Sequence, residues 1–155
     1  MSKSLKRVRA ALEAAGLTPD IREVGQARTA TEAAQAVSCQ IDQICKSIIF
    51  AGEVSGQVRL FLTAGGNQVD AARAADVAGE ALVRADADLI RAQTGFAIGG
   101  VAPLGHVNPI RAWLDPRLLE FNVVWAAAGT PRHVFPLDPK LLPDLTGAQL
   151  AAFTR

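Results

Sequence analysis

"ICKSIIFAGEVSGQVRLFLTAG", residues 44–65, contains two runs of β-branched and large apolar residues separated by a polar, glycine-containing segment. Such residues favour β-strands, and Gly52 and Gly56 suit a tight reversal between the two runs. The stretch therefore predicts a β-hairpin. Lys46 is the single charged residue of the first run, so on a strand its side chain would project from one face of the sheet.

Helical and extended patterns alternate on both sides of this hairpin. Ser4 is a suitable N-cap for a first helix, Gly16 is placed to end it, and Thr29 and Glu32 form a capping-box pattern for a second helix reaching about Val37. Two further helices are expected, one within 67–79 with Val69, Ala72 and Val77 facing inward and one over 88–93 capped by Asp86. The chain should end in a short helical tail. Strands are expected over residues 21–24, 81–84, 110–114, 122–128 and 133–137. This alternation predicts a mixed α/β fold, one mixed sheet with helices packed around it.

Length and charge limit the class of protein. A chain of 155 residues that is 50% hydrophobic predicts one globular domain over residues 1–155. The net charge of +1 lacks the basic excess of proteins that grip long stretches of nucleic acid, so extensive duplex DNA binding is not expected. The sequence contains no apolar run of membrane-spanning length and begins without a signal-peptide pattern, so we expect a cytoplasmic protein and no membrane partner.

Familiar catalytic patterns are missing. The two cysteines, Cys39 and Cys45, form neither a CxxC pair nor a cluster with histidine, so they are expected to be small buried apolar residues and no metal site is predicted. The two histidines, His106 and His133, lie in no recognisable triad signature, and no phosphate-binding P-loop is present, so no cofactor is predicted. On spacing alone, Lys46 is expected to lay its stem along apolar surface while its ammonium reaches water.

In the stretch "TGFAIGGVAPLGH", residues 94–106, a buried-looking run leads into paired glycines and then a proline. Because glycine has no side chain, this pattern indicates a loop whose backbone approaches another group closely. Glycine pairs and proline are also common in ordinary turns, so this segment alone is weak evidence for a site.

Three segments together carry a resemblance to a known family. "CKSIIF" around Lys46, "TGFAIGGVAPLGH" with its Gly99-x-x-x-Pro103 spacing, and "VWAAAGTPRHVF" near the end are similar to the YbaK/ProX superfamily, free-standing relatives of the editing domain of prolyl-tRNA synthetase. The resemblance spans nearly the whole chain. It implies a mixed, barrel-like sheet surrounded by short helices. It also implies an aminoacyl-tRNA deacylase, which hydrolyses the ester between a wrong amino acid and tRNA, chiefly tRNA for proline.

The resemblance also assigns roles to residues. The implied catalytic residues are Lys46, Gly99, Gly100 and Pro103. The implied substrate-binding residues are Ser47, Val101, Ala102, Gly129, Thr130 and His133. Lys46 would hold the 3′-terminal nucleotide or its phosphate, and the loop would offer backbone N–H groups to the oxygen that becomes negative during ester hydrolysis. Water, or the neighbouring ribose hydroxyl of the substrate, would act as the nucleophile.

Two departures bear on the substrate. Ala128-Gly129-Thr130 replaces the serine-glycine-glycine of the cysteine-specific member, and Ser47 stands where alanine-specific relatives carry asparagine. The expected substrate is tRNA carrying alanine or another small residue, with serine and threonine as competitors. The expected partners are the 3′ end of mischarged tRNA and, where one presents the substrate, an aminoacyl-tRNA synthetase. A non-catalytic module that binds tRNA ends or another nucleotide, and a hydrolase of a different small ester, remain the alternatives.

Overall fold

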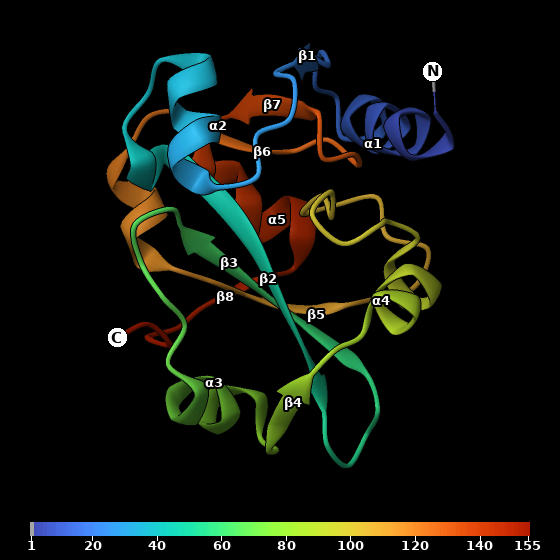
Figure 1. Cartoon of the computed structure of the whole chain (residues 1–155), viewed down its shortest axis with the longest axis vertical. Helices are drawn as coiled ribbons and strands as arrows, with labels where there is room; N and C mark the ends of the chain where they lie inside the picture. The colour runs from blue at the N-terminus through green and yellow to red at the C-terminus, as the bar shows by residue number, and fades with distance from the viewer. Residues whose placement is uncertain (1) are drawn as a thin grey trace.

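Residues 2–155, which the computed structural model describes, form an eight-stranded mixed sheet with five α-helices around it (Figure 1). The strands are β1 Arg22–Glu23, β2 Ile44–Gly52, β3 Val58–Ala64, β4 Leu82–Arg84, β5 Arg111–Leu114, β6 Val124–Ala127, β7 His133–Leu137 and β8 Gln149–Leu150. Their order is β1-β7-β6-β2-β3-β5-β8, and β4 pairs with β2 beside this path. The predicted mixed sheet with short helices around it is confirmed.

The hairpin predicted from residues 44–65 is the antiparallel pair β2 and β3. Its register runs from Cys45 opposite Ala64 to Ala51 opposite Val58. The turn closes where the Gly52 N–H donates to the Gln57 carbonyl over 2.9 Å. Every residue of β3 is buried, whereas the residues in the middle of β2 are only partly buried. Side chains of β2 can therefore reach a ligand or solvent, and those of β3 cannot.

β2 is paired along its whole length on one edge but not on the other. On that second edge, β6 pairs in parallel with Ile44 and Cys45, and β4 pairs with residues 50–52. Residues 46–49 therefore face no strand on this edge. Hydrogen bonding alternates along an antiparallel pair, and Gly52 bonds to β3, so the odd-numbered Ser47 and Ile49 direct their N–H and C=O groups toward the open edge.

The helices begin and end largely where their capping residues predict. They are α1 Lys3–Ala14, α2 Ala30–Val37, α3 Ala71–Ala78, α4 Ala87–Thr94 and α5 Leu142–Thr146, with short 3₁₀ turns at Ile41–Gln43, Pro116–Glu120 and Pro139–Leu141. The side chains of Thr29, Asp70 and Asp86 each accept a backbone N–H at their helix start. The prediction for Ser4 is wrong, because the hydroxyl of Ser2 accepts the Leu5 N–H and the helix begins two residues earlier.

Two further expectations differ from the structure. Ala72 is exposed, and α3 turns Ala74 and Ala78 inward instead, because Asp70 fixes the start of the helix and thereby its rotation. Strand β8 is absent from the sequence-based expectation; it is two residues long, both exposed, and it exists because it can pair with Trp113 and Leu114 of β5. Such a pairing is a tertiary contact with little local pattern.

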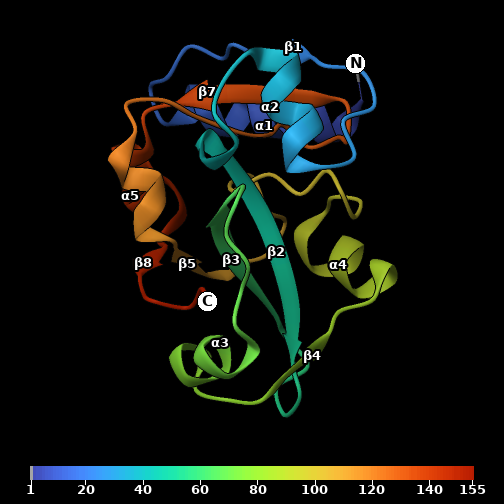
Figure 2. The same cartoon turned by 60° about the vertical axis from the view of Figure 1, so that its left-hand side comes forward.

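The two faces of β2 pack against different clusters. Cys45, Ile49 and Ala51 belong to the main core, which α1 covers, whereas Ile48 and Phe50 pack with Phe61 and Trp113 in a second cluster. Ile44 joins a third cluster with Trp125 and Ala34 of α2. Figure 2 shows α1 and α2 on opposite sides of β7. In residues 2–155, no helix combines the length and apolar composition needed to cross a membrane.

Candidate functional site

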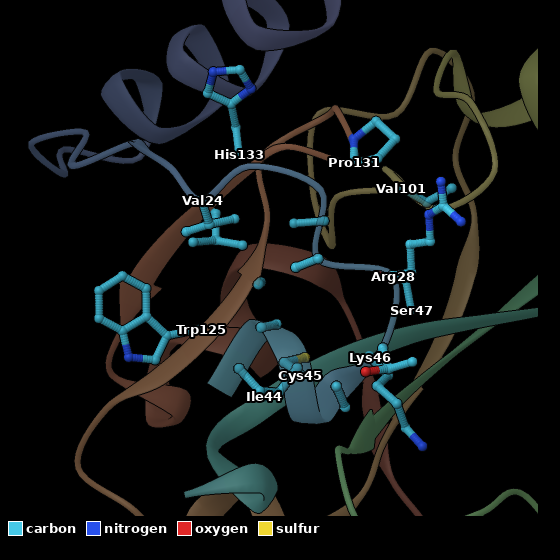
Figure 3. A pocket seen from close by; sticks show the side chains of 18 of the residues that line it. Val24, Arg28, Ile44, Cys45, Lys46, Ser47, Val101, Trp125, Pro131 and His133 are labelled. Carbon is cyan, nitrogen blue, oxygen red and sulfur yellow. The ribbon is translucent and has the colours of Figure 1, made fainter. Parts of the chain in front are cut away.

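A cavity of about 260 Å³ lies where the open edge of β2 meets β6, β7 and the start of α2. Its walls come from segments far apart in sequence: residues 24–33, 44–48, 99–101 and 125–134 (Figure 3). Six of the residues predicted for the site line it, namely Lys46, Ser47, Gly99, Val101, Thr130 and His133. The other four, Gly100, Ala102, Pro103 and Gly129, do not line it.

Lys46 is held by a backbone carbonyl and lies in the field of two carboxylates. Its Nζ donates to the carbonyl of Asn67 over 2.6 Å, and the side chain is half-buried. Partial burial lowers the pKa of the Lys46 ammonium, while the charges of Asp115 and Asp42 act in the opposite direction. An ammonium has three N–H donors, so two remain for a ligand. In Figure 3, the Lys46 side chain leads away from Ile44 and Trp125.

The partner of Lys46 is itself fixed by the buried Asp115. The Asn67 side-chain amide donates to Asp115 Oδ2 over 2.9 Å, and the same oxygen accepts the Ala64 N–H over 3.1 Å. The Arg117 N–H donates to the other carboxylate oxygen. A carboxylate that is only 2% exposed must be compensated in this way. The corner that receives Lys46 is therefore rigid, and Lys46 is not the free surface lysine that its spacing alone suggested.

Ser47 supplies an unsatisfied polar group to the cavity. Its hydroxyl oxygen is buried and has no hydrogen-bond partner within residues 2–155. Its backbone N–H points to the open edge of β2, as the register of the hairpin requires. Buried polar atoms are normally paired, so this hydroxyl is an exception, but with less than 1 Å² accessible it can meet a ligand atom only if the cavity wall shifts. The hydroxyl could have been guessed from the sequence, whereas the free N–H depends on where β6 leaves β2.

The glycine loop presents backbone, but not through both glycines. Gly99 has a φ of +85°, and the Gly100 N–H donates to the Ala97 carbonyl over 3.0 Å, so residues 97–100 form a tight turn. A Cβ on Gly100 would lie 2.7 Å from backbone atoms of Thr130. Gly100 is thus needed for contact between two loops, and its N–H is already used within the protein.

The free donors of this loop lie one step further along the chain. Val101 and Ala102 are 4% and 0% exposed, and neither N–H has a hydrogen-bond partner among residues 2–155. Val101 lines the cavity. The Ala102 carbonyl is bonded to His106 Nε2 over 2.7 Å, and burial lowers the pKa of this histidine. Pro103 lies outside the cavity, in a shallow hollow beside His106, so its role is limited to shaping the loop.

The third segment forms a second tight turn. Gly129 has a φ of +97°, and a Cβ there would lie 2.8 Å from the Ser4 carbonyl oxygen of α1. Thr130 Oγ1 lies 2.6 Å from His133 Nδ1 and accepts the Arg132 N–H over 3.2 Å. The two side chains therefore share a hydrogen bond in which the tautomer of His133 decides whether the hydroxyl or Nδ1 is the donor. Figure 3 shows the His133 ring pointing away from Ile44 and Cys45, so the histidine borders the cavity without pointing toward its centre.

Sequence reasoning missed much of the cavity wall. Val24, Ile44, Trp125 and Val134 supply apolar surface, and Arg28 lies at the mouth. In Figure 3 the guanidinium of Arg28 is on the side of Val101 and Pro131, opposite Trp125. The apolar residues carry no signal beyond strand propensity, and Arg28 only precedes the capping box at Thr29. Their role depends on the approach of the 24–33 segment to β2.

Cys45 also lines the cavity, but burial, together with the charge of Asp115, raises the pKa of its thiol to about 12. The thiol is thus protonated at neutral pH, which removes the nucleophilic form. Among residues 2–155, no three potential metal-ligating side chains gather at one place. What the cavity does offer is backbone N–H donors, one hydroxyl and cations, which suits stabilisation of a developing negative charge.

Comparison with known proteins identifies a matching family and relatives that are similar over nearly the whole chain. A family model for the aminoacyl-tRNA editing domain matches residues 24–145. YwhH of Bacillus subtilis, described as uncharacterized, is 30% identical over 144 residues, which cover 92% of this chain and 91% of YwhH. A solved structure described as a "putative trans-editing enzyme for prolyl tRNA synthetase" is 46% identical, with a TM-score of 0.92 and coverage of 100% of this chain and 99% of that one. A hypothetical protein of known structure is 25% identical, with a TM-score of 0.86 and coverage of 96% and 99%.

The family match covers all three segments on which the resemblance rested, and the fold agrees over the whole chain. The chain therefore belongs to the aminoacyl-tRNA editing domain family.

Proposed function

We propose that the protein is a trans-editing deacylase that hydrolyses the ester of mischarged aminoacyl-tRNA, most readily tRNA for proline carrying alanine or another small amino acid. The observation that carries the proposal is the cavity, to which Lys46, the Gly99–Val101 loop and the Thr130–His133 turn all contribute. The solved relative with the trans-editing description supports the same assignment and points to tRNA for proline.

The chemistry follows from the donors in the cavity. Attack on an ester carbonyl moves negative charge onto its oxygen, and preorganised N–H groups aimed at that oxygen lower the barrier. The free N–H groups of Val101 and Ser47 are the donors we assign to this role, with Gly99 and Gly100 shaping the turn that presents Val101. The attacking group is water or the adjacent ribose hydroxyl of the tRNA, because the Cys45 thiol is held protonated.

Lys46 acts as the fixed positive charge of the site. Lys46 lines the cavity and its ammonium is tethered to Asn67, and we assign its two remaining donors to the terminal nucleotide or the oxygens of the ester. Holding the substrate in an orientation ready for attack lowers the barrier without a nucleophilic side chain. Thr130 and His133 position the adjoining turn through their mutual hydrogen bond.

The size and polarity of the cavity favour a small amino acid. A space of about 260 Å³ must hold part of the terminal nucleotide as well as the aminoacyl group. Trp125, Ile44 and Val134 give it apolar walls, and the unpaired Ser47 hydroxyl lies just beneath the surface of the wall. Alanine fits the apolar wall, and the hydroxyl of serine or threonine would find a partner in Ser47 if the wall shifts, which keeps these two as competing substrates.

The direct test is deacylation of a panel of tRNA-Pro charged with alanine, serine, threonine, cysteine or proline. We expect multiple turnovers with at least one small non-cognate amino acid and none with proline. Adding prolyl-tRNA synthetase to parallel reactions tests whether a synthetase presents the substrate. Tight binding of the charged tRNA without turnover would instead favour the alternative, a non-catalytic module that binds tRNA ends.

A further inference from the structure

A second hollow adjoins the cavity and carries two arginines. It has a volume of about 290 Å³ and is lined by Gln26, Ala27, Arg28, Gly99, Pro131 and Arg132. Four of these residues, Ala27, Arg28, Gly99 and Pro131, also line the inner cavity. The two spaces are therefore adjacent.

The two arginines of this hollow have uncompensated charges. Within residues 2–155, neither Arg28 nor Arg132 forms an ion pair, whereas Arg22, Arg59 and Arg117 do. The Arg28 guanidinium makes one long hydrogen bond, 3.5 Å to the Gln26 side chain, and the Arg132 guanidinium makes none in the same range. Both side chains are exposed.

Their backbones, by contrast, are fixed. The Arg132 N–H donates to Thr130 Oγ1, and its carbonyl accepts the Val24 N–H over 2.8 Å. The Arg28 N–H faces the Glu32 carboxylate at the start of α2, at 3.4 Å. Glu32 is thus engaged by the backbone of the helix start. The hollow therefore presents two guanidinium groups on fixed backbone positions, and their donors are available to an anion.

The geometry points to a phosphate subsite. We propose that Arg28 and Arg132 together bind a backbone phosphodiester of the single-stranded tRNA 3′ end, while the terminal aminoacyl ester occupies the inner cavity. Guanidinium groups bind phosphate oxygens through paired N–H donors, and the two cations line a hollow next to the cavity that we assign to the ester. This inference rests on the proposed function, because it takes the inner cavity as the ester site.

The subsite explains how a nearly neutral protein holds RNA. The net charge of +1 provides little overall attraction, but two uncompensated arginines at one mouth provide it locally. The subsite also assigns two tasks to different residues. Lys46, tethered to Asn67, positions the ester, and Arg28 and Arg132 bind the phosphate.

Two probes and a double variant test the subsite. One probe is a CCA trinucleotide with alanine attached to its 3′ end by an amide, and the other is the same alanine amide of adenosine without a phosphate. In the Arg28→Gln/Arg132→Gln variant, we expect roughly tenfold weaker binding of the trinucleotide and little change for the adenosine probe, because only the first offers phosphates. The slope of log affinity against log salt should fall by about 0.7 for each phosphate that the variant no longer binds.

Arg84→Gln is the matched control, because Arg84 is an exposed arginine on β4, outside this site, and should leave both affinities unchanged. Equal weakening of both probes, or parental affinity for the trinucleotide in the double variant, would overturn the phosphate subsite. Deacylation by the parent protein is measured separately. If the parent deacylates but the double variant binds normally, only the subsite fails; if the parent neither deacylates nor binds either probe, the proposed function fails and the subsite with it.

Discussion

Substitution of Gly100 by alanine tests whether the loop supplies a donor to the reaction. A Cβ at this position would lie 2.7 Å from the Cα and carbonyl carbon of Thr130, whereas ordinary contacts begin at 3.4 Å. The atoms in the way are backbone, so the two loops must separate by about 0.7 Å. A donor that starts at an ideal distance of about 2.9 Å would then stand at about 3.6 Å, which is beyond hydrogen-bond range.

The expected consequence is loss of the Val101 N–H from the transition state. Removing one such donor typically lowers the rate by about 100- to 1,000-fold. The added methyl group should also destabilise the protein by about 1–3 kcal/mol through overpacking. Binding of substrate should suffer much less than the chemical step, because the donor is aimed at charge that develops only during the reaction.

The assay is single-turnover deacylation of alanyl-tRNA-Pro with enzyme in excess, at a temperature well below the Tm of every variant. Affinity for a non-hydrolysable alanyl-adenosine amide is measured alongside. Gly79→Ala is the control, since Gly79 has a φ of +79° at the end of α3 and no atom within 4 Å of its Cβ position. It introduces backbone strain without moving a loop, so its rate should stay parental.

Two results would refute the donor role. A folded Gly100→Ala protein that deacylates at the parental rate would show that the position of the Val101 N–H does not matter. Equal losses in affinity and rate would show that the methyl group only obstructs the cavity, because ground-state and transition-state binding would then fall together.

Three further predictions use other residues of the site. Lys46→Ala should lower deacylation by about 100-fold or more while the fold is retained, because it removes a positioning charge; an unfolded variant, seen by circular dichroism, would make Lys46 structural. Activity should survive both EDTA treatment and replacement of Cys39 and Cys45 by alanine, and loss of the single-turnover rate in a folded protein would overturn the proposed mechanism. For His106, burial lowers the pKa, so the unfolded state binds more protons and stability should fall as the pH drops below about 6.5. Urea unfolding from pH 8 to 5 should therefore show a decline that is smaller in His106→Gln, and an identical decline in both proteins would contradict this assignment.

Local signals in the sequence were sufficient for most elements. The hairpin of residues 44–65 follows from its two apolar runs and turn, and Thr29 and Asp86 mark their helices because a capping side chain acts on N–H groups only three residues away. The start of the first helix is the exception, because Ser4 was expected to cap it and Ser2 does so instead.

The site was predicted through a family resemblance, and the physical roles within it were not readable from local sequence. That Gly100 serves contact with Thr130, and that the free N–H belongs to Val101, depends on two loops 30 residues apart meeting. Likewise, the tether of Lys46 to Asn67 depends on Asp115, which reaches this corner from the end of β5.

The sequence by itself determined which segments are strands and helices, since propensity, capping and hydrophobic alternation act over a few residues. Only the tertiary structure decided where β6 leaves β2. That departure opens the edge at Ser47, and the approach of the 24–33 segment then closes a cavity over it and brings Arg28 toward Arg132. These features arise from strand pairing and loop packing between residues far apart in the sequence. The energies of such contacts cannot be read from patterns that extend over only a few residues.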